Sequence, residues 1–208
     1  MKKISVIVIL FCGILYSEIP ERRIVAEWEP ALGTMIRWPL GIPSDLVVEL
    51  ASDDILYVLV ENNQIWKSEN FESKIIHIPG HTIGHICFYF IKEKIVFTGD
   101  TLFSLGCGRI FEGTYEQMYN SLSKLKNLPL DTKVYCGHEY TLKNSLFCVQ
   151  HDKDNKKLEK KIIEINNKLK KNLPTIPSTI AEELACNIFL RAKNLEDFSK
   201  LRDLKDNF

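Results

Sequence analysis

Pro79-Gly80-His81-Thr82-Ile83-Gly84-His85 is the stretch that decides the fold of this 208-residue chain. Two similar turns follow it, at Thr98-Gly99-Asp100 and at Cys136-Gly137-His138. Each turn ends a short apolar run and carries a side chain that can bind a metal ion. Two imidazoles and a carboxylate delivered in this way suit a divalent metal that activates water.

The segments around these turns predict an α+β fold. Runs of β-branched or aromatic residues at 75–78, 86–91, 95–97 and 133–136 predict short strands. Thr114 and Gln117 have the spacing of a capping box and predict a helix that Pro129 ends. In the C-terminal part, three further helices are predicted from an apolar stripe over 158–169 and from caps at Thr179 and Asn194.

Each candidate ligand also has an ordinary structural interpretation. A histidine after a turn is often a surface residue, and an aspartate in a turn is common. Three strand ends that each present a metal-binding side chain are harder to explain by chance, which favours a site built from His81, Asp100 and His138. His85 precedes a strand directly, so we expect it to have a structural role or to support this site, and not to bind the metal.

From Ile75 to Phe208 the chain resembles the second half of hydroxyacylglutathione hydrolase (glyoxalase II), a member of the metallo-β-lactamase superfamily. The motifs that carry the similarity occur in the family's order, at residues 79–85, 99–104, 106–114, 137–141 and 202–208. Gly-Cys-Gly-Arg at 106–109 and Arg-x-x-Lys-Asp-x-Phe at 202–208 distinguish this family from other members of the superfamily.

The resemblance implies roles for seven residues. His81 would bind one metal and His138 the other, and Asp100 would bridge them as the catalytic carboxylate. The glutathione part of the substrate would be held by Arg109, Tyr140, Arg202 and Lys205. The implied reaction is hydrolysis of an S-2-hydroxyacylglutathione, such as S-lactoylglutathione, by metal-activated water, with zinc as the first expectation and iron or manganese as alternatives. Phe111 stands where some members have tyrosine.

One part of the family pattern is missing. Members carry a Thr-His-x-His-x-Asp-His block upstream that supplies four ligands, whereas this chain has no histidine before His77. We therefore expect only the second half of the αββα sandwich, together with a helical glyoxalase II-type C-terminal domain. Metal binding should be weak or absent, and the uncovered sheet face should promote self-association.

The N-terminal third has a different character. Residues 22–66 resemble the start of the agmatine deiminase and bacterial peptidylarginine deiminase family, through Ala26-Glu27-Trp28-Glu29-Pro30 and a predicted strand at 54–60. None of that family's catalytic residues has a counterpart here. The predicted organisation is a signal peptide (1–17), a deiminase-like segment (22–66), a polar joint (67–74), a metallo-β-lactamase-like half domain (75–147) and the helical domain (148–208).

Composition limits the partners and the compartment. The 27 basic and 27 acidic residues balance, which gives no support to a nucleic-acid partner. The six scattered cysteines match neither a disulfide framework nor a zinc knuckle and favour a reduced, cytoplasmic protein. Lys2, Lys3 and the apolar run 4–15 indicate a secretory signal peptide too short for a stable membrane span. A buried first strand is the alternative.

Three functional interpretations therefore stand side by side. The chain is an impaired hydroxyacylglutathione hydrolase, a catalytically inactive binder of glutathione conjugates, or a fusion of a deiminase start with a hydrolase end. Hydrolysis of a thioester with added metal would separate the first from the second.

Overall fold

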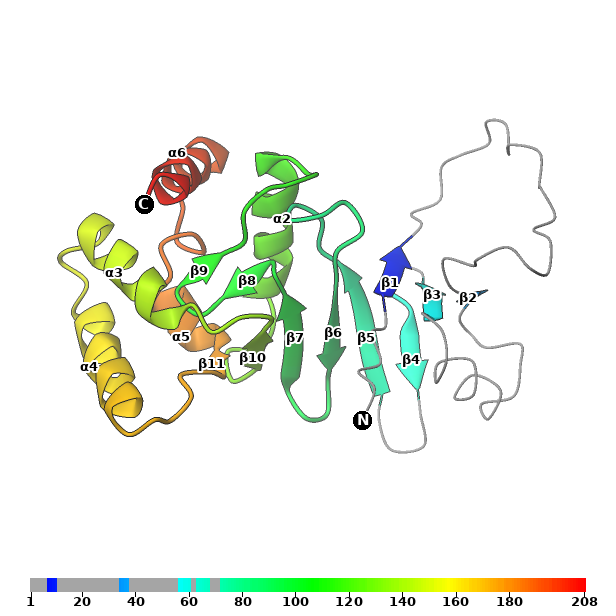
Figure 1. The fold of residues 1–208 in the computed structure, drawn as a ribbon, viewed down its shortest axis with the longest axis horizontal. Coiled ribbons are helices and arrows are strands. Elements are labelled where there is room, and N and C mark those ends of the chain that lie inside the picture. Colours follow the sequence, from blue (N-terminus) through cyan, green and yellow to red (C-terminus); the bar gives the residue numbers. More distant parts are fainter. Residues whose placement is uncertain (1–6, 11–33, 38–55, 61–62, 68–71) are drawn as a thin grey trace, which may run out of the picture. The chain divides into compact units, whose positions relative to one another are not determined.

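The computed structural model describes residues 7–10, 34–37, 56–60, 63–67 and 72–208, and the chain divides into two compact units at Gln64/Ile65 (Figure 1). In the first unit, β1 (Ile7–Leu10), β3 (Leu56–Val60) and β2 (Thr34–Arg37) form a parallel sheet in that order. β1 falls within the first apolar run, and the interpretation of that run as a signal peptide or as a buried strand stays a prediction. The rest of the predicted signal peptide and most of the deiminase-like segment lie outside the described residues.

The second unit contains a six-stranded sheet, in the order β11-β10-β7-β6-β5-β4. Its strands are β4 (Ile65–Lys67), β5 (Glu72–His77), β6 (Ile86–Phe90), β7 (Ile95–Gly99), β10 (Lys133–Cys136) and β11 (Ser178–Thr179). Neighbouring strands are antiparallel except β7 and β10, which are parallel.

The prediction of a polar joint over 67–74 is wrong at both ends of that range. Lys67 ends β4 and Glu72 begins β5, and the two residues pair across this edge of the sheet with an ion pair of 3.2 Å. Charged residues are common on edge strands, so their polarity does not mark a break between domains.

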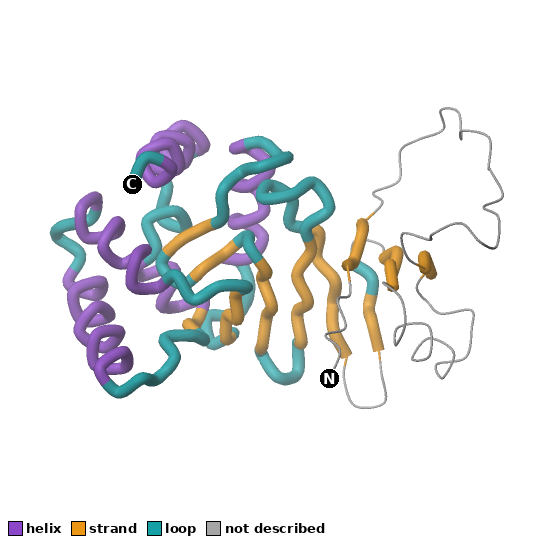
Figure 2. Tube along the Cα trace, in the orientation of Figure 1, coloured by secondary structure: helices purple, strands orange, loops and turns teal. Residues whose placement is uncertain are grey.

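Helices surround one face and one end of this sheet (Figure 2). The predicted capping box at Thr114 and the predicted cap at Thr179 are confirmed, and they open α2 (Tyr115–Lys126) and α5 (Ile180–Cys186); the cap at Thr179 is also a capping box. Asn194 caps α6 (Leu195–Asp206), as predicted. The remaining helices are α3 (Thr141–His151) and α4 (Lys156–Lys170), and a hairpin of β8 (Leu102–Phe103) and β9 (Gly106–Cys107) follows β7.

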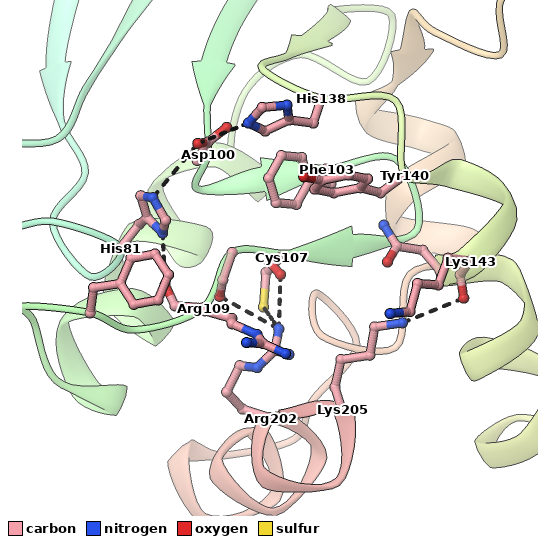
Figure 3. Close-up of a pocket in the computed structure, with 13 residues that line it drawn as sticks. His81, Asp100, Phe103, Cys107, Arg109, His138, Tyr140, Lys143, Arg202 and Lys205 are labelled. Carbon is pink, nitrogen blue, oxygen red and sulfur yellow. Dashed lines mark hydrogen bonds and ion pairs between the residues drawn. The ribbon is translucent and has the colours of Figure 1, made fainter. Parts of the chain in front are cut away.

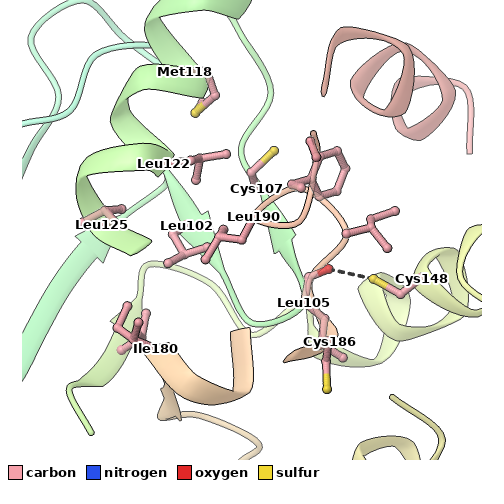
Figure 4. Packing of buried hydrophobic residues seen from close by; sticks show 14 of the residues in the cluster. Leu102, Leu105, Cys107, Met118, Leu122, Leu125, Cys148, Ile180, Cys186 and Leu190 are labelled. Atoms are coloured by element: carbon pink, nitrogen blue, oxygen red, sulfur yellow. Dashed lines mark hydrogen bonds between the residues drawn. The ribbon is translucent and has the colours of Figure 1, made fainter. Parts of the chain in front are cut away.

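A continuous core joins the sheet, the hairpin and the helices. Met118, Leu122 and Leu125 lie one helical turn apart on α2 and are buried against this core (Figure 4). The same cluster includes Leu102 of the hairpin and Ile180 of α5. The hairpin is therefore packed against both α2 and α5.

The opposite face of the sheet is aromatic and partly exposed. The ring of Phe97 stacks on Tyr135 at 5.4 Å, contacts Phe90 at 5.8 Å, and is 46% exposed. Phe88 is the cross-strand partner of Phe97 and is half-buried. Among the described residues, no helix has the length and apolar character that crossing a membrane requires.

Candidate functional site

The three predicted metal-binding side chains meet at one edge of the sheet (Figure 3). β5, β7 and β10 run in the same direction, so their carboxyl ends share that edge. His81, Asp100 and His138 each follow one of these ends. Asp100 Oδ2 lies 3.6 Å from His81 Nε2 and 3.5 Å from His138 Nε2, so one carboxylate oxygen faces both imidazoles.

The chain fixes the orientation of His81. Its Nδ1 lies 2.8 Å from the backbone carbonyl of Arg109, and a carbonyl only accepts hydrogen bonds, so Nδ1 carries the proton. The other ring nitrogen, Nε2, then presents its lone pair toward Asp100. This is the arrangement that prepares a histidine to bind a metal ion.

His85 holds Asp100 through its backbone, which is one of the two roles predicted for it. The N–H of Asp100 donates to His85 Nε2 at 3.0 Å. Because this N–H donates to it, His85 Nε2 carries no proton. Burial lowers the pKa of His85, and the nearby His81 acts in the same direction. His85 is therefore a support for the site.

Two glycines allow the close approach of these turns. Gly99 has φ of +50°, and a Cβ there would lie 2.5 Å from His85 Nε2. A Cβ on Gly137 would lie 2.3 Å from Asp100 Oδ1. Any larger residue at either position would displace a group of the site, which explains the Gly-Asp and Gly-His pairs of the sequence.

A cavity of about 460 Å³ extends from this cluster to a positively charged end. All seven predicted site residues line it. The far end is formed by Arg109, Lys143, Arg202 and Lys205, which come from the loop after β9 and from α3 and α6. Tyr140 lies between the two ends and stacks on His138 at 5.0 Å.

The four cations at the far end differ in how far they are free to contact a ligand. Arg202 is 2% exposed and donates to the carbonyls of Cys107 and Gly108 and to Asp206 Oδ1. It therefore holds the β9 backbone in place, and only its Nε has no partner among the described groups. Arg109 Nε lies 3.4 Å from the same Asp206 oxygen, but its side chain is 60% exposed.

Lys205 is fixed by two aromatic rings. Its Nζ lies 4.8 Å from the ring centre of Phe147 and 4.7 Å from that of Phe208, and it donates to the carbonyl of Lys143 at 3.4 Å. Burial lowers the pKa of Lys205 to about 8, and the positive charges of Arg202 and Lys143 contribute in the same direction. The amine is still mostly protonated at neutral pH.

The donor set fits a metal site only in part. Zinc bonds to nitrogen and carboxylate oxygen measure about 2.1 Å, which places two donors on one tetrahedral ion about 3.4 Å apart. Each histidine–Asp100 pair has this spacing. No group of three or more His, Cys, Asp or Glu side chains within the described ranges could hold one ion, whereas catalytic zinc usually has three protein ligands. Each ion would thus receive two donors.

Some lining residues were missed by the sequence analysis. Lys143 and Asn144 lie on α3, which the sequence analysis did not predict, and Phe103 and Cys107 lie on the β8–β9 hairpin. Cys107 belongs to the Gly-Cys-Gly-Arg motif, which was the available signal for it. Lys143 lies in no such motif, so only its place on α3 in the folded chain identifies it.

Two family models match the second unit in succession. Metallo-beta-lactamase superfamily matches residues 67–138, and Hydroxyacylglutathione hydrolase C-terminus matches residues 139–208. The solved structure of ETHE1 from Myxococcus xanthus is similar, with 27% identity and a TM-score of 0.50, covering 70% of this chain and 51% of that one. The fold and the site define a metallo-β-lactamase superfamily protein, and membership of that superfamily implies a divalent metal.

Curated relatives narrow this class to one family. The chain is 70% identical to a hydroxyacylglutathione hydrolase of Pelagibacter ubique (strain HTCC1062), over 73% of the chain and 63% of the relative. It is 43% identical to that of Prochlorococcus marinus (strain MIT 9312), over 82% of the chain and 70% of the relative. The chain belongs to the hydroxyacylglutathione hydrolase family. It spans about three fifths of the length of the Pelagibacter relative.

The deiminase resemblance gains no support from these comparisons. Both family models lie between residues 67 and 208, and the described part of 22–66 contains only β2, β3 and residues 63–66.

Proposed function

We propose that this chain acts on S-2-hydroxyacylglutathione thioesters as a hydroxyacylglutathione hydrolase, with turnover limited by how well it retains its metal. The observation that carries this proposal is the single cavity with a His81–Asp100–His138 cluster at one end and cations at the other. The thioester carbonyl would lie at the first end and the carboxylates of glutathione at the second.

The residues of the chain have separable tasks in this proposal. A divalent ion, when bound, supplies an activated water and polarises the carbonyl. His81 Nε2 and Asp100 Oδ2 would supply one pair of donors to such an ion, and His138 Nε2 with the same Asp100 oxygen would supply another. Arg109 and Lys205 bind carboxylate, while Arg202 holds the strand beneath them. Zinc, iron and manganese are all compatible with this donor set.

A matched pair of assays tests the proposal. Hydrolysis of S-lactoylglutathione is followed by the released thiol, with zinc, iron(II) or manganese(II) added to the purified chain and to Asp100→Asn. We expect metal-dependent hydrolysis that the variant abolishes. A rate of hydrolysis that changes neither with added metal nor with the substitution would contradict the proposal.

The second candidate function is binding of glutathione conjugates without turnover. It is favoured by the two donors that each ion would receive among the described residues. S-hexylglutathione that binds in calorimetry, together with no hydrolysis at any metal concentration, would establish this function in place of the first.

Self-association forms a further part of the proposal. The aromatic sheet face around Phe97 is the surface that we expect to mediate it, because exposed apolar patches of this kind favour contacts between proteins.

A further inference from the structure

Lys143 is a cavity residue that lies outside the motifs discussed above. It projects from α3 beside Lys205 of α6, at the charged end of the cavity (Figure 3). The residue is exposed, and no ion pair of its ammonium group is found in the described part of the chain. A cation in a cavity without an acidic partner is available to a ligand.

The positive charge at this end of the cavity exceeds the negative charge that contacts it, so more than one anionic group can be bound. Four cations line it, and the carboxylate that contacts them is Asp206, which is shared by Arg109 and Arg202. Lys143 and Lys205 therefore remain without an acidic partner among the described residues. A ligand with two carboxylates compensates this charge better than a ligand with one.

The two lysines are also held differently. Lys205 is fixed by two rings and by the Lys143 carbonyl, so its position is set before a ligand binds. The Lys143 side chain is free to follow a flexible group. Glutathione has such a group in its γ-glutamyl end, which carries the second carboxylate.

We infer that Lys143 binds the γ-glutamyl carboxylate of the substrate and makes the cavity selective for the whole tripeptide over shorter thiols. This inference rests on the proposed function, because it assumes that a glutathione conjugate occupies the cavity. It adds a specificity-determining residue on α3 to the binding groups that the motifs supply. The contact is made through solvent-accessible groups, so its effect on affinity is limited.

Calorimetry with two non-hydrolysable ligands tests the inference. S-hexylglutathione carries both carboxylates, whereas N-acetyl-S-hexylcysteinylglycine keeps the amide and the glycine carboxylate but lacks the γ-glutamyl one. The unaltered chain should prefer the tripeptide. Lys143→Gln should lower the affinity for S-hexylglutathione by about fivefold, the contribution of one accessible ion pair, and leave the affinity for the shorter ligand unchanged. Lys143→Arg should keep the preference.

The controls separate this contact from other effects. Lys160→Gln removes the same charge from an exposed position on α4 that does not line the cavity, and it should change neither affinity. The substitution at 143 keeps the backbone carbonyl that anchors Lys205. Equal weakening of both ligands, or no weakening, would overturn the role of Lys143 alone. Failure of both ligands to bind the unaltered chain would overturn the proposed function as well.

Discussion

At the scale of single residues, the site depends on groups that hold other groups. Arg109 fixes the proton of His81 through its carbonyl, and His85 fixes the backbone of Asp100. Glu183 holds the backbone of the β8–β9 hairpin beside the cavity. Its Oε2 accepts from the N–H of Leu105 and from Asn187 Nδ2, at 2.9 Å each. Orientation of the reactive groups is thus built into their neighbours.

Glu183 also predicts how stability depends on pH. Burial raises its pKa from 4.5 to about 7. The folded chain therefore keeps a proton that the unfolded chain releases above its lower pKa, so this group makes the free energy of unfolding fall as pH rises from about 4.5 to 7. In Glu183→Gln, an amide oxygen can accept both hydrogen bonds without titrating.

Urea unfolding at pH 5 and pH 8 measures this effect. We expect the loss of stability between the two pH values to be smaller in Glu183→Gln, by roughly 2 kcal/mol. An identical loss in both proteins would show that Glu183 does not titrate differently in the folded chain.

At the scale of elements, the turn after β10 is held by the segment that leads into β11. Thr175 is buried, and both its backbone N–H and its hydroxyl donate to Glu139 Oε1, at 2.5 and 2.7 Å. Its hydroxyl oxygen also lies 2.7 Å from that of Thr141. Glu139 lies between His138 and Tyr140 in the sequence, so this contact positions two residues that line the cavity.

Thr175→Val tests this positioning with little change in shape. The substitution removes the hydroxyl but keeps the backbone donor. We expect zinc affinity to fall by about tenfold, as when a group that orients a metal-binding histidine is lost. The control is Thr132→Val, because the buried Thr132 hydroxyl has no hydrogen-bond partner among the described groups. Equal changes in the two variants would argue against a positioning role.

The same elements show how far the sequence predicts this structure. Strand ends with Pro-Gly-His, Gly-Asp and Gly-His are local patterns, and they predicted the cluster of His81, Asp100 and His138. The sequence analysis missed α3 because Tyr140, its N-cap residue, makes no side-chain capping bond and gives no start signal. The position of Lys143 in the cavity follows from α3 and was missed with it.

Burial of polar groups also escaped prediction. Glu183 is the N4 residue of a capped helix and reads as a solvent-exposed charge, yet the hairpin loop at Leu105 covers it. Arg202 belongs to a motif for which the family resemblance predicts substrate binding, but most of its donors hold the chain itself. Such contacts join segments that are far apart in the sequence, so no local pattern contains them.

At the scale of the whole molecule, the described sheet presents an aromatic face whose central residue, Phe97, is 46% exposed. We expect the purified chain to associate as its concentration increases, and Phe97→Lys to reduce this association in sedimentation velocity. Ile163→Lys is the control, because Ile163 is 62% exposed on α4, away from this face. A monomer at all concentrations, or an equal effect of both substitutions, would contradict the expectation.

Weak metal retention is expected from the small number of donors that the described residues bring to the cavity. The described residues supply a positively charged end of the cavity and three donors, but two donors for each ion. We therefore propose that the chain keeps this cavity while holding its metal weakly.

Zinc content after equilibrium dialysis of the purified chain tests this claim most directly. We expect less than one zinc ion per chain at low free zinc, with a further decrease in Asp100→Asn. Two ions per chain that survive dialysis against a chelator would contradict the account, because they would require ligands beyond His81, Asp100 and His138.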